Sequence, residues 1–165
     1  MQLSFESPNQ ADAIALIAEL DAYQLSLYPP ESHHGLDLAS VAEQGLVFVM
    51  ARDDAGHAAG CGAVVLSAEY GELKRMYVRP QHRGLGLAKK ILQTLEVAAI
   101  ASACPMLKLE SGPYQPEALG LYARSGFERC DRYGAYPDDP LSVFMQKKLA
   151  GPRDAACADA APKAA

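Results

Sequence analysis

Residues 72–95 read ELKRMYVRPQHRGLGLAKKILQTL, and this stretch decides how the rest of the chain is interpreted. A strand-like run ends at Arg79-Pro80 and leads into the glycine turn Arg83-Gly84-Leu85-Gly86. Behind the turn, apolar residues at 88, 91, 92 and 95 predict a helix. A glycine turn that opens a helix directs several backbone N–H groups and the positive end of the helix dipole at one point. We therefore expect a pyrophosphate site here, beside the end of a strand.

The glycine spacing departs from two common phosphate-binding patterns. No Gly-Lys-Ser/Thr follows four residues after a glycine, as a P-loop requires, and Lys89 occupies the place of the third glycine of the dinucleotide fingerprint. Taken alone, the Gly-Leu-Gly turn is also compatible with a tight strand-to-helix connection that binds no ligand. The sequence around the turn has to decide between these interpretations.

Composition is that of an ordinary globular protein and argues against several kinds of partner. The 165 residues are 50% hydrophobic and 21% charged, enough for one domain with a core. With a net charge of −5 and no run of more than two Lys or Arg, nucleic acid binding is not expected. No apolar run reaches the ~20 residues of a membrane helix, and residues 1–10, MQLSFESPNQ, lack the basic and apolar parts of a secretory signal. We expect a cytoplasmic protein without membrane contact.

Cysteine and histidine spacing gives no sign of a metal site. The four cysteines form no CxxC pair and no ligand spacing with a histidine, so no metal is expected.

Hydrophobic periodicity predicts one mixed α/β domain over residues 1–149. Helical spacing is found over 10–28, 86–102 and 117–124, and a short helix is also predicted over 38–44. Strands are expected at residues 2–5 and in the runs LVFVMAR, AAGCGAVVLS, ELKRMYV, MLKLE and LSVFMQKKL. The order predicts helices packed on a central, mostly antiparallel twisted sheet. Residues 150–165, AGPRDAACADAAPKAA, are rich in Ala and Pro and are predicted to form a disordered tail.

Two motifs in this order resemble signatures of the GCN5-related N-acetyltransferases, the GNAT superfamily. The run from Arg83 to Ala88, behind Val78-Arg79-Pro80, is similar to Arg/Gln-x-x-Gly-x-Gly/Ala. The run Ala118-x-x-Leu121-Tyr122-x-x-x-Gly126-Phe127 is similar to a second signature downstream. The resemblance covers about residues 3–149 and implies the GNAT fold, with helices on both faces of the sheet and strands splayed at the acetyl-CoA site. The end of the chain also resembles a bacterial subgroup of mostly uncharacterised predicted N-acetyltransferases.

The resemblance implies acetyl-CoA as cosubstrate. By position, backbone amides of the glycine turn bind the pyrophosphate, and the preceding strand end pairs with the pantetheine arm, whose two amides can mimic an extra strand. Gly84 and Gly86 are expected because a Cβ would obstruct approach of the main chain to phosphate. The Arg83 side chain can add charge or lie at the surface, and the family usually has Asn where this chain has Gln115. The residues assigned to the cofactor are Met76, Tyr77, Val78, Arg83, Gly84, Leu85, Gly86, Leu87, Ala88 and Gln115.

Acetyl transfer to an amine needs a base for the ammonium and an acid for the departing thiolate. Glu72 stands near the start of the cleft strand, where several family members place a glutamate base, and desolvation there would raise its pKa. The alternative is a solvated glutamate at a strand end. Tyr122 falls on the family tyrosine whose hydroxyl points at the CoA sulfur and can protonate the thiolate. A core tyrosine bonded to the backbone is the alternative.

The acceptor side is predicted from two segments. The loop over residues 28–38 stands where this family often lines the acceptor pocket, and the segment over residues 133–139 can form one wall of it. Each also has a simpler interpretation, as exposed loop histidines and as a structural cover over the last strand. The candidates for binding the acceptor are Tyr28, Glu31, His34, Tyr133 and Tyr136. Lys74 and Arg75 fit a substrate carboxylate or a charged sheet edge, and the sequence does not separate the two.

The expected function is direct, acetyl-CoA-dependent transfer to a primary amine of a small molecule or amino-acid-like acceptor. Homodimers are common in the family, so a homodimer is compatible with this interpretation. The alternatives are a protein lysine or N-terminal acetyltransferase and a non-catalytic acyl-CoA-binding sensor. A small-molecule enzyme should have its pocket closed by residues 28–38 and 133–139, whereas a protein-modifying enzyme should have an open groove there.

Overall fold

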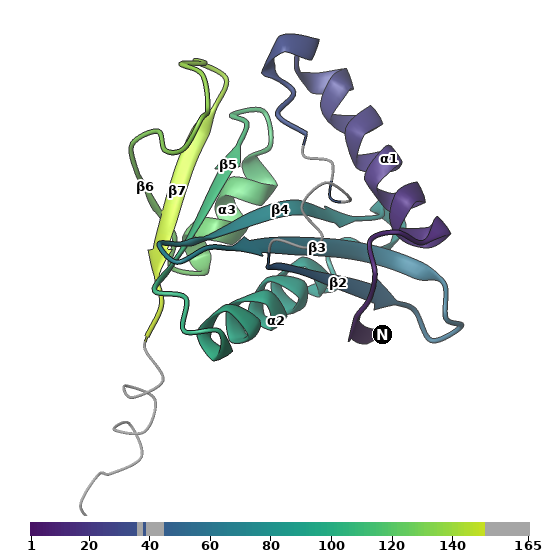
Figure 1. Ribbon diagram of the computed structural model, residues 1–165. Coiled ribbons are helices and arrows are strands. Elements are labelled where there is room, and N and C mark those ends of the chain that lie inside the picture. Colours follow the sequence, from purple (N-terminus) through teal and green to yellow (C-terminus); the bar gives the residue numbers. More distant parts are fainter. Residues whose placement is uncertain (36–37, 39–44, 151–165) are drawn as a thin grey trace, which may run out of the picture.

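The computed structural model describes residues 1–35, 38 and 45–150 (Figure 1). Nearly all of the expected helix over 38–44 and of the expected tail lies outside the described residues. Each of the other expected helices and strands is present with ends that differ by a few residues, and the two-residue strand β6 is additional. The elements are β1 (Gln2–Phe5), α1 (Ala11–Leu27), η1 (Pro30–Ser32), β2 (Leu46–Arg52), β3 (Ala58–Leu66), β4 (Gly71–Val78), η3 (Pro80–His82), α2 (Leu87–Ala101), β5 (Met106–Ser111), α3 (Pro116–Arg124), β6 (Glu128–Arg129) and β7 (Val143–Lys148).

The strands of the described chain form one sheet in the order β1-β2-β3-β4-β5-β7-β6. Neighbouring strands are antiparallel except β4 and β5, which run parallel. This parallel pair is joined only at Gly71 with Leu107 and at Glu72 with Lys108. Beyond these pairs β4 continues to Val78 and β5 to Ser111, but the two strands no longer pair with each other and therefore separate. The mostly antiparallel sheet with a splayed centre is confirmed.

Helices cover both faces of the sheet, with α1 on one face and α2 on the other (Figure 1). The α2 side holds the larger core, because residues of α2 at spacings of three and four turn one apolar stripe inward. The buried residues of α2 are Leu87, Ile91, Leu92, Leu95 and Ala99. A Cβ at Gly62 of β3 would lie 2.7 Å from Ile91, so this glycine allows the close approach of helix and sheet. Among the described residues, no helix is both long and apolar enough to cross a bilayer.

A β-bulge interrupts the pairing of β3 and β4. Cys61 pairs with Tyr77 and Ala63 with Lys74, so two residues of β4 oppose one of β3. The first of them, Arg75, has a left-handed backbone with φ of +55°. Arg75 lies on the α1 face, because its guanidinium pairs with Asp21 of α1, and Lys74 lies on that face because it alternates with Leu73, which packs in the α2-side core. The bulge therefore places two successive cations on the same face of the sheet, where a regular strand would alternate them.

Candidate active site

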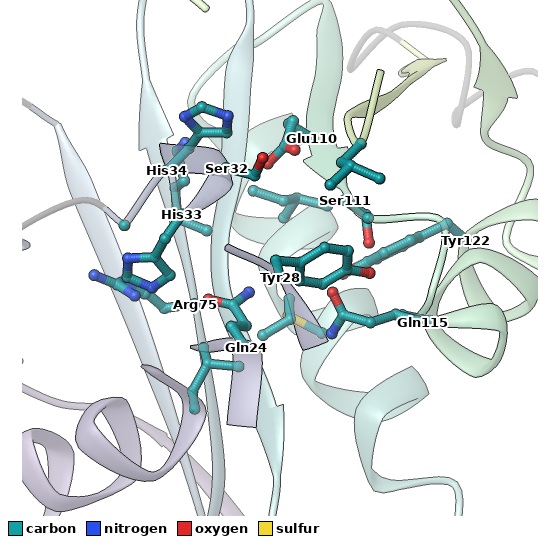
Figure 2. Close-up of a pocket in the computed structure, with 18 residues that line it drawn as sticks. Gln24, Tyr28, Ser32, His33, His34, Arg75, Glu110, Ser111, Gln115 and Tyr122 are labelled. Atoms are coloured by element: carbon teal, nitrogen blue, oxygen red, sulfur yellow. The ribbon is translucent and has the colours of Figure 1, made fainter. Parts of the chain in front are cut away.

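A pocket lies where β4 and β5 separate (Figure 2). Its walls come from α1, the loop over residues 32–35, the middle of β4, the end of β5 and the start of α3. The separation matters because the edge of β4 that faces β5 is left without a partner strand beyond Glu72. An extended ligand can pair with the backbone groups of this edge.

Tyr122 of α3 lines this pocket. Its ring is buried and packs edge-on against Phe127 at a centroid distance of 5.7 Å. Within the described residues its hydroxyl makes no hydrogen bond to another side chain or to the backbone, which differs from the core tyrosine considered above. Burial raises the pKa of Tyr122, because desolvation disfavours the phenolate. The hydroxyl is therefore a protonated donor at neutral pH.

Tyr28 and Gln115 both line the pocket (Figure 2). The hydroxyl of Tyr28 accepts a hydrogen bond from the backbone N–H of Tyr114 (2.9 Å), and the two rings stack at 5.4 Å. A Cβ at Gly112 would lie 2.1 Å from the Tyr28 ring, so the ring packs directly on that backbone. These contacts tie the end of α1 to the loop before α3, where Gln115 is the N-cap residue.

Glu72 lies at the closed end of the splayed strands and does not line the pocket. Its Oε1 accepts hydrogen bonds from the hydroxyls of Tyr133 (3.0 Å) and Tyr136 (2.5 Å) and lies 3.0 Å from Nζ of Lys74. Burial, and then the charge of Glu72, raise the pKa values of both tyrosines. Lys74 also donates to the Tyr136 hydroxyl and lines the pocket. Tyr133 and Tyr136 thus form a layer behind Lys74, outside the pocket lining, and base catalysis by Glu72 stays a prediction.

Glu110 is a pocket carboxylate that the sequence did not single out. It follows Leu107 and Leu109, which pack in the α2-side core, so the alternation of β5 turns Glu110 to the α1 face. Its Oε1 accepts a hydrogen bond from the Ser142 hydroxyl (2.8 Å). Desolvation raises the pKa of Glu110, partly offset by that hydrogen bond and by nearby cations. The sequence indicated only that Glu110 is one of the two polar residues that alternate with leucines in the run MLKLE.

The loop after α1 meets the segment before β7 at one wall of the pocket. Nε2 of His34 lies 3.4 Å from Oδ2 of Asp139, and the His34 ring packs edge-on against Tyr136 at 5.5 Å. Hydrogen bonds from the Leu141 backbone and the Ser32 hydroxyl lower the pKa of Asp139, so it stays an anion in this contact. The two predicted segments therefore lie side by side.

The other predicted acceptor residue of this loop, Glu31, lies elsewhere. It is exposed and is not part of the pocket wall. His33, the residue after Ser32, lines the pocket instead.

The glycine turn presents open backbone at the start of α2. Gly84 and Gly86 have φ of +77° and +72°, and no atom lies within 4 Å of a Cβ built on either residue. The N-cap residue of α2 is Gly86, and no side chain caps this end of the helix. The first-turn N–H groups are therefore available to a ligand. A pyrophosphate fits this turn both by donors and by space.

The side chains of the turn differ in their surroundings. Nε of Arg83 donates to the Val78 carbonyl (3.0 Å), and its guanidinium lies 5.5 Å from the ring centre of Tyr23 and 6.0 Å from that of Tyr77. Leu85 is exposed, whereas Leu87 is buried in the α2-side core. Any role of Leu85 and Leu87 in phosphate binding thus belongs to their backbone.

The other predicted cofactor residues differ in position. Met76 lines the pocket and also lies beside Gly62, whereas Tyr77 is buried in the α1-side core. Ala88 is half-buried against the α2-side core.

The sequence matches the model of the Acetyltransferase (GNAT) family over residues 15–127. It is 43% identical to the IAA acetyltransferase of Azospirillum brasilense, with 87% of this chain and 95% of the relative covered. It is 33% identical to the uncharacterized N-acetyltransferase YsnE of Bacillus subtilis (strain 168), with 90% and 100% covered.

Solved structures share the fold. A protein of Klebsiella pneumoniae, provisionally named an acyl-CoA N-acyltransferase, superposes with a TM-score of 0.81 at 42% identity, with 90% of this chain and 97% of that chain covered. The phosphinothricin acetyltransferase of Sinorhizobium meliloti in complex with AcCoA gives 0.64 at 18% identity, with 92% and 90% covered, which shows the fold alone. The splayed sheet, the glycine turn and these matches agree, and the chain belongs to the GNAT family of acetyltransferases.

Proposed function

We propose that this acetyltransferase uses acetyl-CoA and transfers the acetyl group directly to a primary amine of a small molecule or amino-acid-like acceptor. The observation that carries the small-molecule part is the contact between the loop after α1 and the segment before β7, through His34, Asp139 and Tyr136. A polypeptide acceptor requires an extended groove, whereas a small ligand requires a concave pocket with a few convergent polar groups.

Two parts of the site fit acetyl-CoA. The open backbone from Gly84 to Ala88 suits the pyrophosphate, and the edge of β4 beyond Glu72, left without pairing to β5, suits the pantetheine amides. Gln115 at the start of α3 offers an amide on the far wall. When bound, acetyl-CoA supplies the acetyl group as an activated thioester. The residues of the chain hold and orient it, so that proximity accounts for much of the rate.

Tyr122 holds a proton at its hydroxyl inside the pocket and is the proposed acid for the departing sulfur. Support comes from its place in the pocket wall and from its raised pKa, which keeps the hydroxyl, unbonded within the described part of the chain, in the donor form. An acid positioned in this way contributes typically about 10²–10⁴-fold to a rate.

Two carboxylates are candidates for the base. The family position implies Glu72, but its Oε1 is engaged by two hydroxyls and lies close to Lys74. Geometry supports Glu110, because it lines the same pocket as Tyr122 and its raised pKa suits proton uptake from an ammonium. We assign the contact with the amine to Glu110 and the positioning of Lys74 and the tyrosine layer to Glu72.

The test is release of free thiol from acetyl-CoA with a panel of amines, combined with calorimetry of CoA binding. Binding together with amine-dependent release is expected. Binding without release for any amine would support the sensor alternative, and release only with peptides would support a protein acetyltransferase.

A further inference from the structure

The pocket presents more positive than negative groups to a ligand. Two cations, Lys74 and Arg75, line it, and Glu110 is the carboxylate among the described lining residues, beside the histidines His33 and His34. Three further carboxylates, which contact these cations and histidines, do not line the pocket: Asp21, Glu72 and Asp139. These carboxylates offset much of the charge of Lys74 and Arg75, and what the lining itself offers to an anionic group is the N–H donors of these two side chains.

Arg75 owes its place in this wall to the bulge of β4. A left-handed φ is uncommon for a residue other than glycine, and such backbone is found most often where function requires it. The side chain is 8% exposed, and its Nη1 lies 2.5 Å from Oδ1 of Asp21. Nε2 of His33 lies 3.2 Å from the same oxygen. Asp21, which lies outside the pocket lining, thus contacts both the Arg75 and the His33 side chain.

The charged groups are arranged along the pocket. In Figure 2, Arg75 and His33 lie on one side of the pocket, Glu110, Ser111 and Tyr122 lie on the other, and Tyr28 stands between them. A guanidinium has five N–H donors in a planar fork that suits carboxylates and can serve more than one of them.

We propose that the acceptor is an amino carboxylic acid whose carboxylate binds against Arg75 and His33, while its amine faces Glu110 and Tyr122. This inference rests on the proposed function and narrows its substrate class. It also separates the two interpretations that the sequence left open for Arg75, in favour of the substrate carboxylate.

Acceptors that differ only in the carboxylate provide the test. Thiol release is measured for L-amino acids, for their amides and for the corresponding decarboxylated amines at saturating acetyl-CoA. The amide has a less basic amine and the decarboxylated compound a more basic one, so a preference over both does not arise from basicity. We expect kcat/KM for the acids to be at least about tenfold higher, which is about 1.4 kcal/mol.

Variants connect this preference to Arg75. Arg75→Asn removes the charge and suits the left-handed backbone, because Asn adopts it more readily than most residues. It should raise KM for the acids about tenfold or more and leave CoA affinity unchanged. Arg79→Gln is the matched control, because Arg79, directly after β4, also forms an ion pair with α1, through Glu19 at 2.7 Å, and lies outside the pocket. It should keep the preference.

Each outcome has a distinct meaning. Equal turnover of acids and neutral amines by the unmodified protein overturns the inference and leaves the proposed function standing. An equal loss of CoA affinity in Arg75→Asn also overturns it. Release with no amine at all overturns the proposed function and the inference with it. If Arg75→Asn does not fold, Arg75→Lys keeps the charge without the fork and should lose part of the preference, and an unchanged preference in that variant overturns the inference.

Discussion

A substitution in the glycine turn before α2 should affect both the stability of the fold and the binding of CoA, and the two effects can be measured separately. Gly84→Ala places an L-residue at φ of +77°, where the left-handed backbone costs about 1–2 kcal/mol. No atom lies within 4 Å of the new Cβ, so no clash adds to this cost. For a chain of this size, each kcal/mol lowers Tm by about 2–4 °C, so a loss of about 2–8 °C is expected.

A matched control exists in the turn between β2 and β3. Gly56 has φ of +85° and equally open space around its Cβ position, so Gly56→Ala should lose a similar amount of stability. The two variants should differ in CoA binding. The Cβ introduced at position 84 stands where a pyrophosphate would approach the backbone donors, and we expect Kd to rise at least about tenfold, or about 1.4 kcal/mol. Gly56→Ala should bind as the unmodified protein does.

Calorimetry with CoA and thermal unfolding of both variants complete this test. Equal CoA affinity in Gly84→Ala and Gly56→Ala would refute the placement of the pyrophosphate at the turn, whatever their Tm values.

The remaining predictions concern protons. Tyr122→Phe should lower turnover about 10²–10⁴-fold with CoA affinity intact, and equal losses in both would make the tyrosine a packing residue. Because burial raises the pKa of Glu110, kcat/KM should fall as pH drops through that pKa, and Glu110→Gln but not Glu72→Gln should flatten this limb. Because the pKa of Glu110 is raised in the folded protein, ionisation of Glu110 destabilises the fold as pH rises above 4.5, the pKa of this group in the unfolded chain. Glu110→Gln should therefore raise Tm near neutral pH and not below about pH 4.5, and a Tm gain that persists in acid would contradict this. Hydrogen bonds from Arg52 hold the pKa of Glu6 at about 2 against 4.5, so their contribution to stability is present above pH 4.5 and is lost as pH falls toward 2. In Arg52→Gln, Tm should therefore fall less between pH 4.5 and pH 2 than in the unmodified protein. An unchanged dependence of Tm on pH would show that the Arg52–Glu6 pair contributes nothing to stability.

Much of the fold could be predicted because its determinants are local. The apolar period of α2, the alternation of β5 and the glycine turn each lie within a short run of sequence. The bulge at Arg75 was not predicted, although the two successive polar residues Lys74 and Arg75 interrupt the alternation of this strand between Leu73 and Met76. It lies opposite Gly62 of the neighbouring strand, where a Cβ would meet Met76 and Ile91, and these contacts are not visible in the sequence of β4 alone.

The site was predicted less completely, because its contacts join residues far apart in the chain. Tyr133 and Tyr136 reach Glu72 across 61 and 64 positions, so their assignment to the acceptor pocket could not anticipate a layer behind it. The burial of Glu110 could not be predicted for a related reason. A polar residue at the end of an amphipathic strand is solvated unless another segment covers it, and here Ser142 of a distant segment does so.

Sheet register gives a further reason to separate the roles of the two carboxylates. Glu72 pairs with Lys108 at the last rung that joins β4 to β5, so it lies where the slot between the strands is still closed. Glu110 lies two residues beyond Lys108 and therefore on the same face of β5, past the point of separation. A base must reach an amine that approaches a thioester held between separated strands. Its position along the slot supports the proposal of Glu110 as the base, whereas Glu72 in that role would need a water molecule or Lys74 to connect it with the amine.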